Sequence, residues 1–220
     1  MFDLEKQDLK NKKVIVRVDL NVPLDDNDNV TDTTRIVACK ETVDLILEKG
    51  GTCILISHLG RPKGKENKFS LKKIVDTVSS VLNHPVFFYE DCVGQGAQEA
   101  ISKLDQGSII LMENLRFYVE ETLGDRVFAK NLSELGDIYV NDAFGTCHRE
   151  HASTAVIAEY FENKKFAGKL LQKELRAINQ IAKNGKKPVL AILGGAKVSS
   201  KLSILYNLIK NVDKIIIGGG

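Results

Sequence analysis

Short apolar runs alternate along the chain with segments in which apolar positions recur at helical spacing. The runs are four to six residues long and rich in β-branched side chains. Such runs predict strands that are buried on both faces. The expected strands cover residues 13–18, 52–56, 85–89, 108–112, 137–140, 188–193 and 214–217.

The segments between these runs predict helices. In the first of them Ile36, Val43 and Leu47 fall on one side, and the pattern stops at Gly50-Gly51. Ser70 stands where an N-cap is expected for the second. The expected helices cover 33–49, 71–82, 95–104, 125–135, 168–183 and 197–209. Repeated strand–helix–strand order predicts an α/β fold, with a mostly parallel sheet between two helical layers.

The last part of the chain predicts a second, unfinished unit. Helix 168–183 has mixed faces, which fits either a connector between domains or an ordinary surface helix. The strands at 188–193 and 214–217, with one helix between them, leave one side of their sheet without cover, and 218–220 is a glycine turn after a strand. We therefore expect a domain over 1–167, a connecting helix and linker over 168–187, and the start of a truncated α/β domain over 188–220.

Composition excludes several classes of protein. The chain is 43% hydrophobic and 27% charged, as in ordinary soluble domains. Its apolar runs fall far short of the roughly 20 residues that a membrane helix needs, and its N-terminus has no apolar signal segment. The cysteines are far apart and form no CxxC pair: Cys39, Cys53, Cys92 and Cys147. That spacing argues against a zinc site or a disulfide scaffold and predicts reduced thiols in a cytoplasmic protein.

Charge is unevenly distributed. The net charge of +2 is too small to indicate a nucleic-acid partner. Residues 169–220 carry ten Lys or Arg against two Asp or Glu, whereas residues 1–168 carry 21 against 27. The basic end fits a polyanionic ligand such as a nucleotide, but it fits the solvated face of a helix as well.

Polar and basic residues follow the expected strands at their carboxyl ends, where parallel α/β sheets bind ligands. They are Asp19 and Asn21 after the first strand, His58 and Arg61 after the second, Arg116 after the fourth and Arg149 after the fifth, with Arg35 at the start of the first helix. Arginine suits phosphate and carboxylate groups because its planar fork stays charged. These arginines predict an anion site, although each alone also fits a surface salt bridge, and Asp19 and Asn21 also fit turn positions before Pro23.

A second candidate site is Gly194-Gly195-Ala196-Lys197, between an expected strand and helix. Small residues there let a phosphate approach the helix N-terminus, and Lys197 and Lys201 share one helix face. A lone GGxK is a weak signal, and a glycine turn with solvated lysines also fits. The chain contains no GxxxxGK[ST], GxGxxG or GxSxG motif.

Seven motifs resemble those of the phosphoglycerate kinase family, in order and at the expected spacing. They are RVDLNVP (17–23), SHLGRPKG (57–64), ENLRF (113–117), GDIYVNDAFGT (136–146), HREHAS (148–153), LGGAKVSSK (193–201) and IIIGGG (215–220). The resemblance covers the whole chain. It implies two Rossmann-like domains joined by a hinge helix, with 3-phosphoglycerate on the first and the nucleotide on the second, in a protein nearly twice this length.

The resemblance also implies an activity and a set of site residues. The activity is reversible phosphoryl transfer from 1,3-bisphosphoglycerate to ADP, giving 3-phosphoglycerate and ATP in glycolysis. Mg²⁺ accompanies the nucleotide, with its ligands outside this chain. The implied substrate-binding residues are Asp19, Asn21, Arg35, His58, Leu59, Gly60, Arg61, Arg116 and Arg149; the nucleotide-binding residues are Gly195, Lys197, Lys201 and Gly219. Arg35 and Lys197 would be catalytic, and Arg61, Arg116 and Arg149 would grip the substrate phosphate.

The expected protein is a cytoplasmic monomer without nucleic-acid or membrane partners. The 220-residue chain alone is expected to bind 3-phosphoglycerate without turnover. The alternative is an anion-binding module that performs no catalysis.

Overall fold

The computed structural model describes residues 4–184, 187–194 and 212–218. They belong to two compact units, Met1–Gln172 and Lys173–Gly220. The division falls inside helix α6 (Lys169–Asn184), within the segment for which a connecting helix is predicted. The role of that helix as a hinge stays a prediction.

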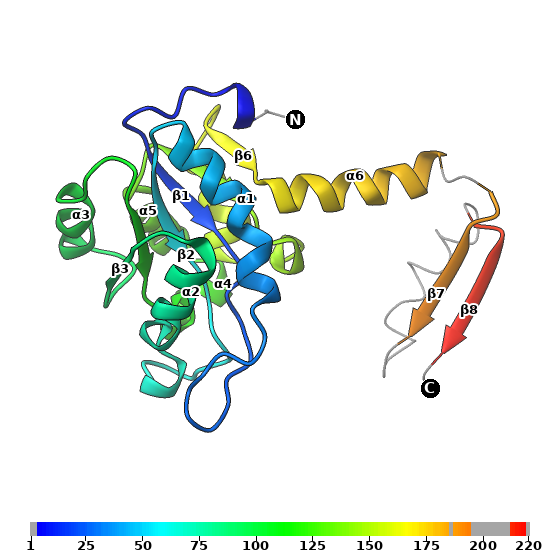
Figure 1. Ribbon diagram of the computed structural model, residues 1–220, viewed down its shortest axis with the longest axis horizontal. Coiled ribbons are helices and arrows are strands. Elements are labelled where there is room, and N and C mark those ends of the chain that lie inside the picture. The colour runs from blue at the N-terminus through cyan, green and yellow to red at the C-terminus, as the bar shows by residue number, and fades with distance from the viewer. Residues whose placement is uncertain (1–3, 185–186, 195–211, 219–220) are drawn as a thin grey trace. The chain divides into compact units, whose positions relative to one another are not determined.

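The first unit is built on a six-stranded sheet in the order β3-β4-β2-β1-β5-β6, in which all neighbours run parallel (Figure 1). The strands are β1 (Lys13–Arg17), β2 (Thr52–Ile56), β3 (Val86–Tyr89), β4 (Ile109–Met112), β5 (Ile138–Asn141) and β6 (Lys165–Ala167). The predicted parallel sheet is thereby confirmed. The sequence did not predict β6, whose three residues at the sheet edge carry too short an apolar run.

Helices cover both faces of this sheet, which confirms the three-layer prediction. One face carries α1 (Thr34–Glu48) and α2 (Val75–Leu82), and the other carries α3 (Gln95–Ser102) and α5 (Arg126–Ser133). Successive residues of a strand point to opposite faces. Val14 and Val16 accordingly pack in the core beneath α1, whereas Ile15 packs with Phe128 on the other side.

Several helix starts follow local side-chain chemistry. Ser70 caps as predicted, since its Oγ accepts a hydrogen bond from the Lys72 amide at 3.2 Å. The turn after it is the 3-10 helix η3 (Leu71–Ile74), so α2 begins later than the sequence predicted. Asp125 caps α5 through the Phe128 amide at 2.8 Å. The remaining short elements are η1 (Leu4–Lys6), η2 (Asn67–Phe69), η4 (Leu115–Phe117), α4 (Val119–Leu123), η5 (Phe144–Thr146), the π-helix η6 (Ala152–Val156) and η7 (Ile157–Tyr160).

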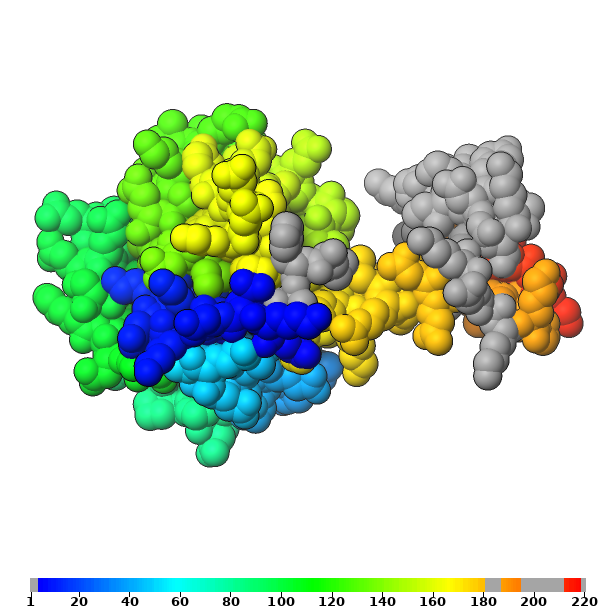
Figure 2. Space-filling view, turned by 90° about the horizontal axis from the view of Figure 1, so that it is seen from above, coloured from blue at the N-terminus to red at the C-terminus, as the bar shows by residue number. Residues whose placement is uncertain are grey.

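The N-terminal segment lies along the surface of the first unit, where Figure 2 shows it in blue. The Asn11 amide donates to the Gly50 carbonyl at 3.0 Å, and Lys49 Nζ donates to the Gln7 carbonyl at 3.1 Å. Glu5 forms an ion pair with Lys169 at the start of α6. The N-terminal segment therefore contacts the residues that follow α1 and the first residue of α6.

Two buried polar side chains hold the start of α6. The Lys169 amide donates to Thr42 Oγ1 at 2.8 Å, and the Leu171 amide donates to Asp142 Oδ1 at 3.1 Å. A Cβ on Gly168 would lie only 2.2 Å from Asp142 Oδ1, so only glycine fits there. Asp142 therefore supplies the acceptor that the first amides of the helix require.

The carboxyl group of Asp142 makes stability depend on pH. Burial raises its pKa to about 6, against roughly 3.9 in an unfolded chain. The folded protein therefore binds this proton more tightly, and lowering the pH from 7 to 4 stabilises the wild type relative to Asp142→Asn. Two pKa units correspond to about 3 kcal/mol. Urea unfolding of both proteins at pH 7, 5.5 and 4 measures the difference, and a difference that does not change with pH contradicts the prediction.

The second unit is described over part of its length. Strands β7 (Leu190–Gly194) and β8 (Lys214–Gly218) pair in parallel, with Leu190 opposite Lys214. The predicted helix over 197–209 lies outside the described residues.

Among the helices that the structure does describe, none has the length and apolar character needed to span a membrane.

Candidate functional site

A pocket of about 270 Å³ lies at the carboxyl ends of the central strands. Because the sheet order places β4, β2, β1 and β5 side by side, the loops that follow these strands meet at one edge. Its lining residues are Asp19, Asn21, Arg35, His58, Gly60, Arg61, Arg116, Gly145, Thr146 and Arg149. We call it the arginine pocket. It brings together every predicted substrate-binding residue except Leu59.

The other predicted residues lie elsewhere. The Leu59 side chain is buried in the core, while its carbonyl accepts from Asn114 Nδ2 at 2.8 Å. The predicted nucleotide-binding residues Gly195, Lys197, Lys201 and Gly219 lie outside the described residues. Gly145 and Thr146 line the pocket although the sequence analysis did not select them; their position in the loop after β5 was the available signal.

Gly60 ties three loops of the pocket together. Its amide donates to Asn21 Oδ1 at 2.7 Å, and its carbonyl accepts from Arg116 Nη1 at 2.6 Å. Its φ of 64° lies in the left-handed region, which favours glycine. A Cβ there would also lie 2.4 Å from the Phe69 ring. The backbone of Gly60 therefore holds Asn21 and Arg116 in position relative to each other, and glycine is the residue that allows this backbone conformation.

Asp19 takes the turn position that the sequence left open, and it also pairs with an arginine. Its Oδ1 accepts from the Asn21 amide at 3.2 Å, as in an Asx turn. Its Oδ2 lies 2.5 Å from Arg35 Nη1, so this carboxylate also pairs with one of the arginines. Arg35 is thus a salt-bridged arginine on the rim of the pocket.

The remaining three arginines have no such partner. Across the described residues, no carboxylate lies within 4.0 Å of Arg61, Arg116 or Arg149. Burial lowers the pKa of Arg116, and the charges of Arg149 and Arg17 lower it further. Three cations that share a pocket without acidic partners produce a positive potential that favours an anionic ligand.

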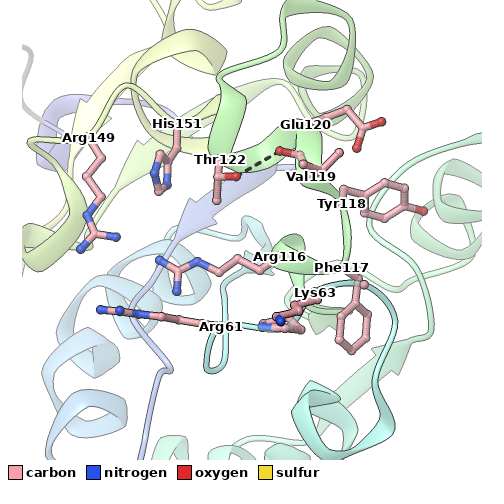
Figure 3. Close-up of a pocket in the computed structure, with 12 residues that line it drawn as sticks. Arg61, Lys63, Arg116, Phe117, Tyr118, Val119, Glu120, Thr122, Arg149 and His151 are labelled. Atoms are coloured by element: carbon pink, nitrogen blue, oxygen red, sulfur yellow. Dashed lines mark hydrogen bonds between the residues drawn. The ribbon is translucent and has the colours of Figure 1, made fainter.

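The same three arginines also border a second cavity, of about 510 Å³. Figure 3 shows their guanidinium groups gathered at one side of this cavity, with Phe117 and Tyr118 at the other. The arginines thus lie between two open spaces. The arginine pocket on one side is lined mainly by polar and basic residues, whereas the larger cavity on the other side also has the aromatic side chains of Phe117 and Tyr118 in its wall.

His58 is a neutral member of the arginine pocket. Burial lowers its pKa to about 2, and the neighbouring charges of Arg17, Arg116, Arg149 and Arg35 act in the same direction. The imidazole therefore carries no charge at physiological pH and serves as a hydrogen-bonding group.

Arg17 is a further residue of this region that sequence reasoning missed. It ends β1, is fully buried, and places Nη2 3.1 Å from His58 Nδ1. A charged residue inside a run of β-branched residues was the available signal. Burial lowers the pKa of Arg17, and the negative charge of Glu121 opposes that shift.

The described residues supply no metal centre. No group of three or more His, Cys, Asp or Glu side chains gathers among them. The four cysteines are free thiols, and only Cys147 is exposed. Burial raises the pKa of Cys39 to about 12, which leaves that thiol unreactive.

Comparisons with known proteins agree on one family. The model of the phosphoglycerate kinase family matches residues 4–220. The cytosolic phosphoglycerate kinase 3 of Arabidopsis thaliana is 48% identical over 217 residues, which cover 99% of this chain and 54% of the relative. The phosphoglycerate kinase of Koribacter versatilis is 50% identical, with 96% of this chain and 54% of the relative covered.

Solved structures agree as well. Phosphoglycerate kinase from Pyrococcus horikoshii matches with a TM-score of 0.89 at 32% identity, over 100% of this chain and 55% of that one. The enzyme from Coxiella burnetii matches with a TM-score of 0.85 at 38% identity, over 99% and 54%. The chain thus spans about half the length of the relatives it matches. With the family model covering nearly all of its residues, the chain belongs to the phosphoglycerate kinase family.

Proposed function

We propose that the arginine pocket binds 3-phosphoglycerate. The observation that carries the proposal is the convergence of Arg61, Arg116 and Arg149 without carboxylate partners among the described residues. A phosphate dianion supplies the charge and the acceptor oxygens that three guanidinium groups require. Asn21 and His58 line the same pocket and offer hydrogen bonds to the hydroxyl and carboxylate groups of the ligand.

In the whole enzyme, the proposed reaction is reversible phosphoryl transfer. The bond between phosphorus and the carboxyl oxygen of 1,3-bisphosphoglycerate breaks, and a bond forms to the β-phosphate oxygen of ADP, which leaves 3-phosphoglycerate and ATP. The charge of the transition state spreads over the equatorial oxygens, so positioning and positive charge are sufficient and no base is needed. We assign that stabilisation to Arg35 and Lys197, and the contacts to the nucleotide to Gly195, Lys197, Lys201 and Gly219.

The proposal gives each segment a task. Residues 1–167 bind the glycerate, 168–187 form the hinge, and 188–220 begin the nucleotide domain. Closure of the two domains over the substrates expels water, which limits hydrolysis of the acyl phosphate. Mg²⁺ arrives bound to the nucleotide, and we assign it no ligand in this chain. A monomer in the cytoplasm is proposed as well; relatives named cytosolic support the location, and relatives named chloroplastic also match.

Calorimetry of the 220-residue chain with 3-phosphoglycerate tests the proposal. We expect binding that weakens as salt rises, because opposite charges at an open site are screened. Glycerate, which lacks the phosphate, should bind much more weakly, and a coupled assay should detect no turnover by this chain alone. Failure to bind 3-phosphoglycerate contradicts the proposal. Equal affinity for inorganic phosphate and 3-phosphoglycerate would instead favour an anion-binding module.

A further inference from the structure

We propose that Arg17 is a positioning residue that fixes His58 in the tautomer with its proton on Nε2, and that Ser153 and Glu121 hold Arg17 in place. The inference deepens the proposed function and rests on it for the identity of the ligand. It assigns a task to a buried cation that is not itself among the residues lining the arginine pocket. It rests on three observations: the contacts of Arg17, the absence of an acceptor on its guanidinium group, and the hydrogen bonds that Ser153 makes to Glu121.

The guanidinium of Arg17 is completely surrounded by protein. Nε donates to Ser153 Oγ at 2.9 Å, and Nη1 donates to the carbonyl of Val18. Nη2 lies 3.1 Å from His58 Nδ1. Since the side chain is only 1% exposed, water does not replace these partners. The orientation of the guanidinium is therefore set by the serine, the carbonyl and the imidazole together.

The contact with His58 determines the tautomer. A guanidinium has five N–H donors and no acceptor. Nδ1 of His58 must therefore accept the hydrogen bond, and the proton of the neutral ring resides on Nε2. His58 lines the arginine pocket, so its Nε2–H is the ring donor that remains for a ligand. The ring thus offers one donor of fixed position.

A rigid set of contacts supports Arg17 from behind. Ser153 Oγ, which accepts from Arg17, donates to Glu121 Oε1 at 2.6 Å, and the Ser153 amide donates to Glu121 Oε2 at 2.9 Å. Tyr139 OH donates to the Ser153 carbonyl at 2.8 Å. Glu121 is 1% exposed and supplies the largest opposing charge for Arg17. Ser153 lies in the π-helix η6, a helix type that occurs often at functional sites.

The neutral, oriented imidazole suits an anionic ligand in a crowded basic pocket. A protonated ring would add a further positive charge beside Arg116, Arg149 and Arg35, which already disfavour it. The other tautomer would direct a lone pair at ligand oxygens and repel them. Arg17 excludes that tautomer without itself contacting the ligand.

Nitrogen-15 NMR of the histidine side chains in the 220-residue chain tests the tautomer without any ligand. In the wild type we expect His58 to keep its proton on Nε2 from pH 5 to pH 8. In Arg17→Met/Glu121→Gln, which removes both buried charges together, His58 should populate both tautomers or become protonated towards pH 5. The variant should bind 3-phosphoglycerate about tenfold more weakly, the value of roughly one hydrogen bond to a charged group.

Two controls show whether the change at His58 comes from the loss of Arg17 and its contacts. His84, exposed beside Asp44 and distant in sequence from this network, should give the same signals in all proteins. Ser153→Ala keeps both charges and removes only the bridge, so it should shift His58 in the same direction to a smaller extent. It also serves as the test if the double variant does not fold.

Each outcome decides a separate question. A wild-type His58 with its proton on Nδ1, or variants in which His58 and the affinity for 3-phosphoglycerate stay unchanged, would overturn the role of Arg17. A shifted tautomer in the variants, combined with no binding of 3-phosphoglycerate by the wild type, would support that role and overturn the proposed function.

Discussion

Arg116→Ala is expected to weaken the binding of 3-phosphoglycerate by roughly 10- to 150-fold, which corresponds to about 1.5–3 kcal/mol for a hydrogen bond to a charged group. Arg116 has two tasks that alanine removes. It supplies one of the three uncompensated charges in the arginine pocket, and its Nη1 holds the carbonyl of Gly60 at 2.6 Å. Isothermal calorimetry at low salt measures the change in affinity.

The matched control is Arg126→Ala. Arg126 pairs with Glu159 on an exposed surface and is not among the residues that line the arginine pocket. Its loss should leave the affinity unchanged. Arg116→Lys should recover only part of the affinity, because lysine keeps the charge but lacks the planar fork. An affinity of Arg116→Ala within twofold of the wild type contradicts the assignment of the phosphate to this residue.

Glu121→Gln is expected to lower the free energy of unfolding by about 3 kcal/mol, the low end of the cost of leaving a buried charge uncompensated, because Ser153 Oγ bridges Glu121 and Arg17. The amide has nearly the shape of the carboxylate, so packing changes little. The charge of Arg17 is then left without its largest opposing charge in a fully buried site. Urea unfolding followed by circular dichroism measures the loss.

A double-mutant cycle separates charge from packing. Arg17→Met should also destabilise, but Arg17→Met/Glu121→Gln should cost at least about 1 kcal/mol less than the sum of the two, because neither charge is left alone. The exposed pair of Arg126 and Glu159 is the control, and its removal should cost less than about 1 kcal/mol. Additive effects of Arg17 and Glu121 would show that the two charges do not stabilise each other.

Much of the fold was determined by local features of the sequence. The β-branched runs predicted the central strands β1, β2 and β4 because strands buried on both faces require continuous apolar residues. Ser70 and Asp125 have side-chain oxygens that accept from amides two and three residues further along the chain. The alternation of strands and helices then placed the strand-end loops at one edge. The predicted arginines meet there because parallel strands share that edge.

The tertiary structure decided features that depend on contacts between distant residues. Whether an arginine faces a ligand, a carboxylate or the interior is set by its neighbours in space, so Arg35 pairs with Asp19 while Arg17 is buried against His58 and Ser153. The three-residue strand β6 forms because β5 offers it a partner. The sequence alone thus determined the order of elements and the edge at which basic residues gather. Only folding decided which charges remain uncompensated, because that depends on burial and on partners more than a hundred residues away, such as Glu121 for Arg17.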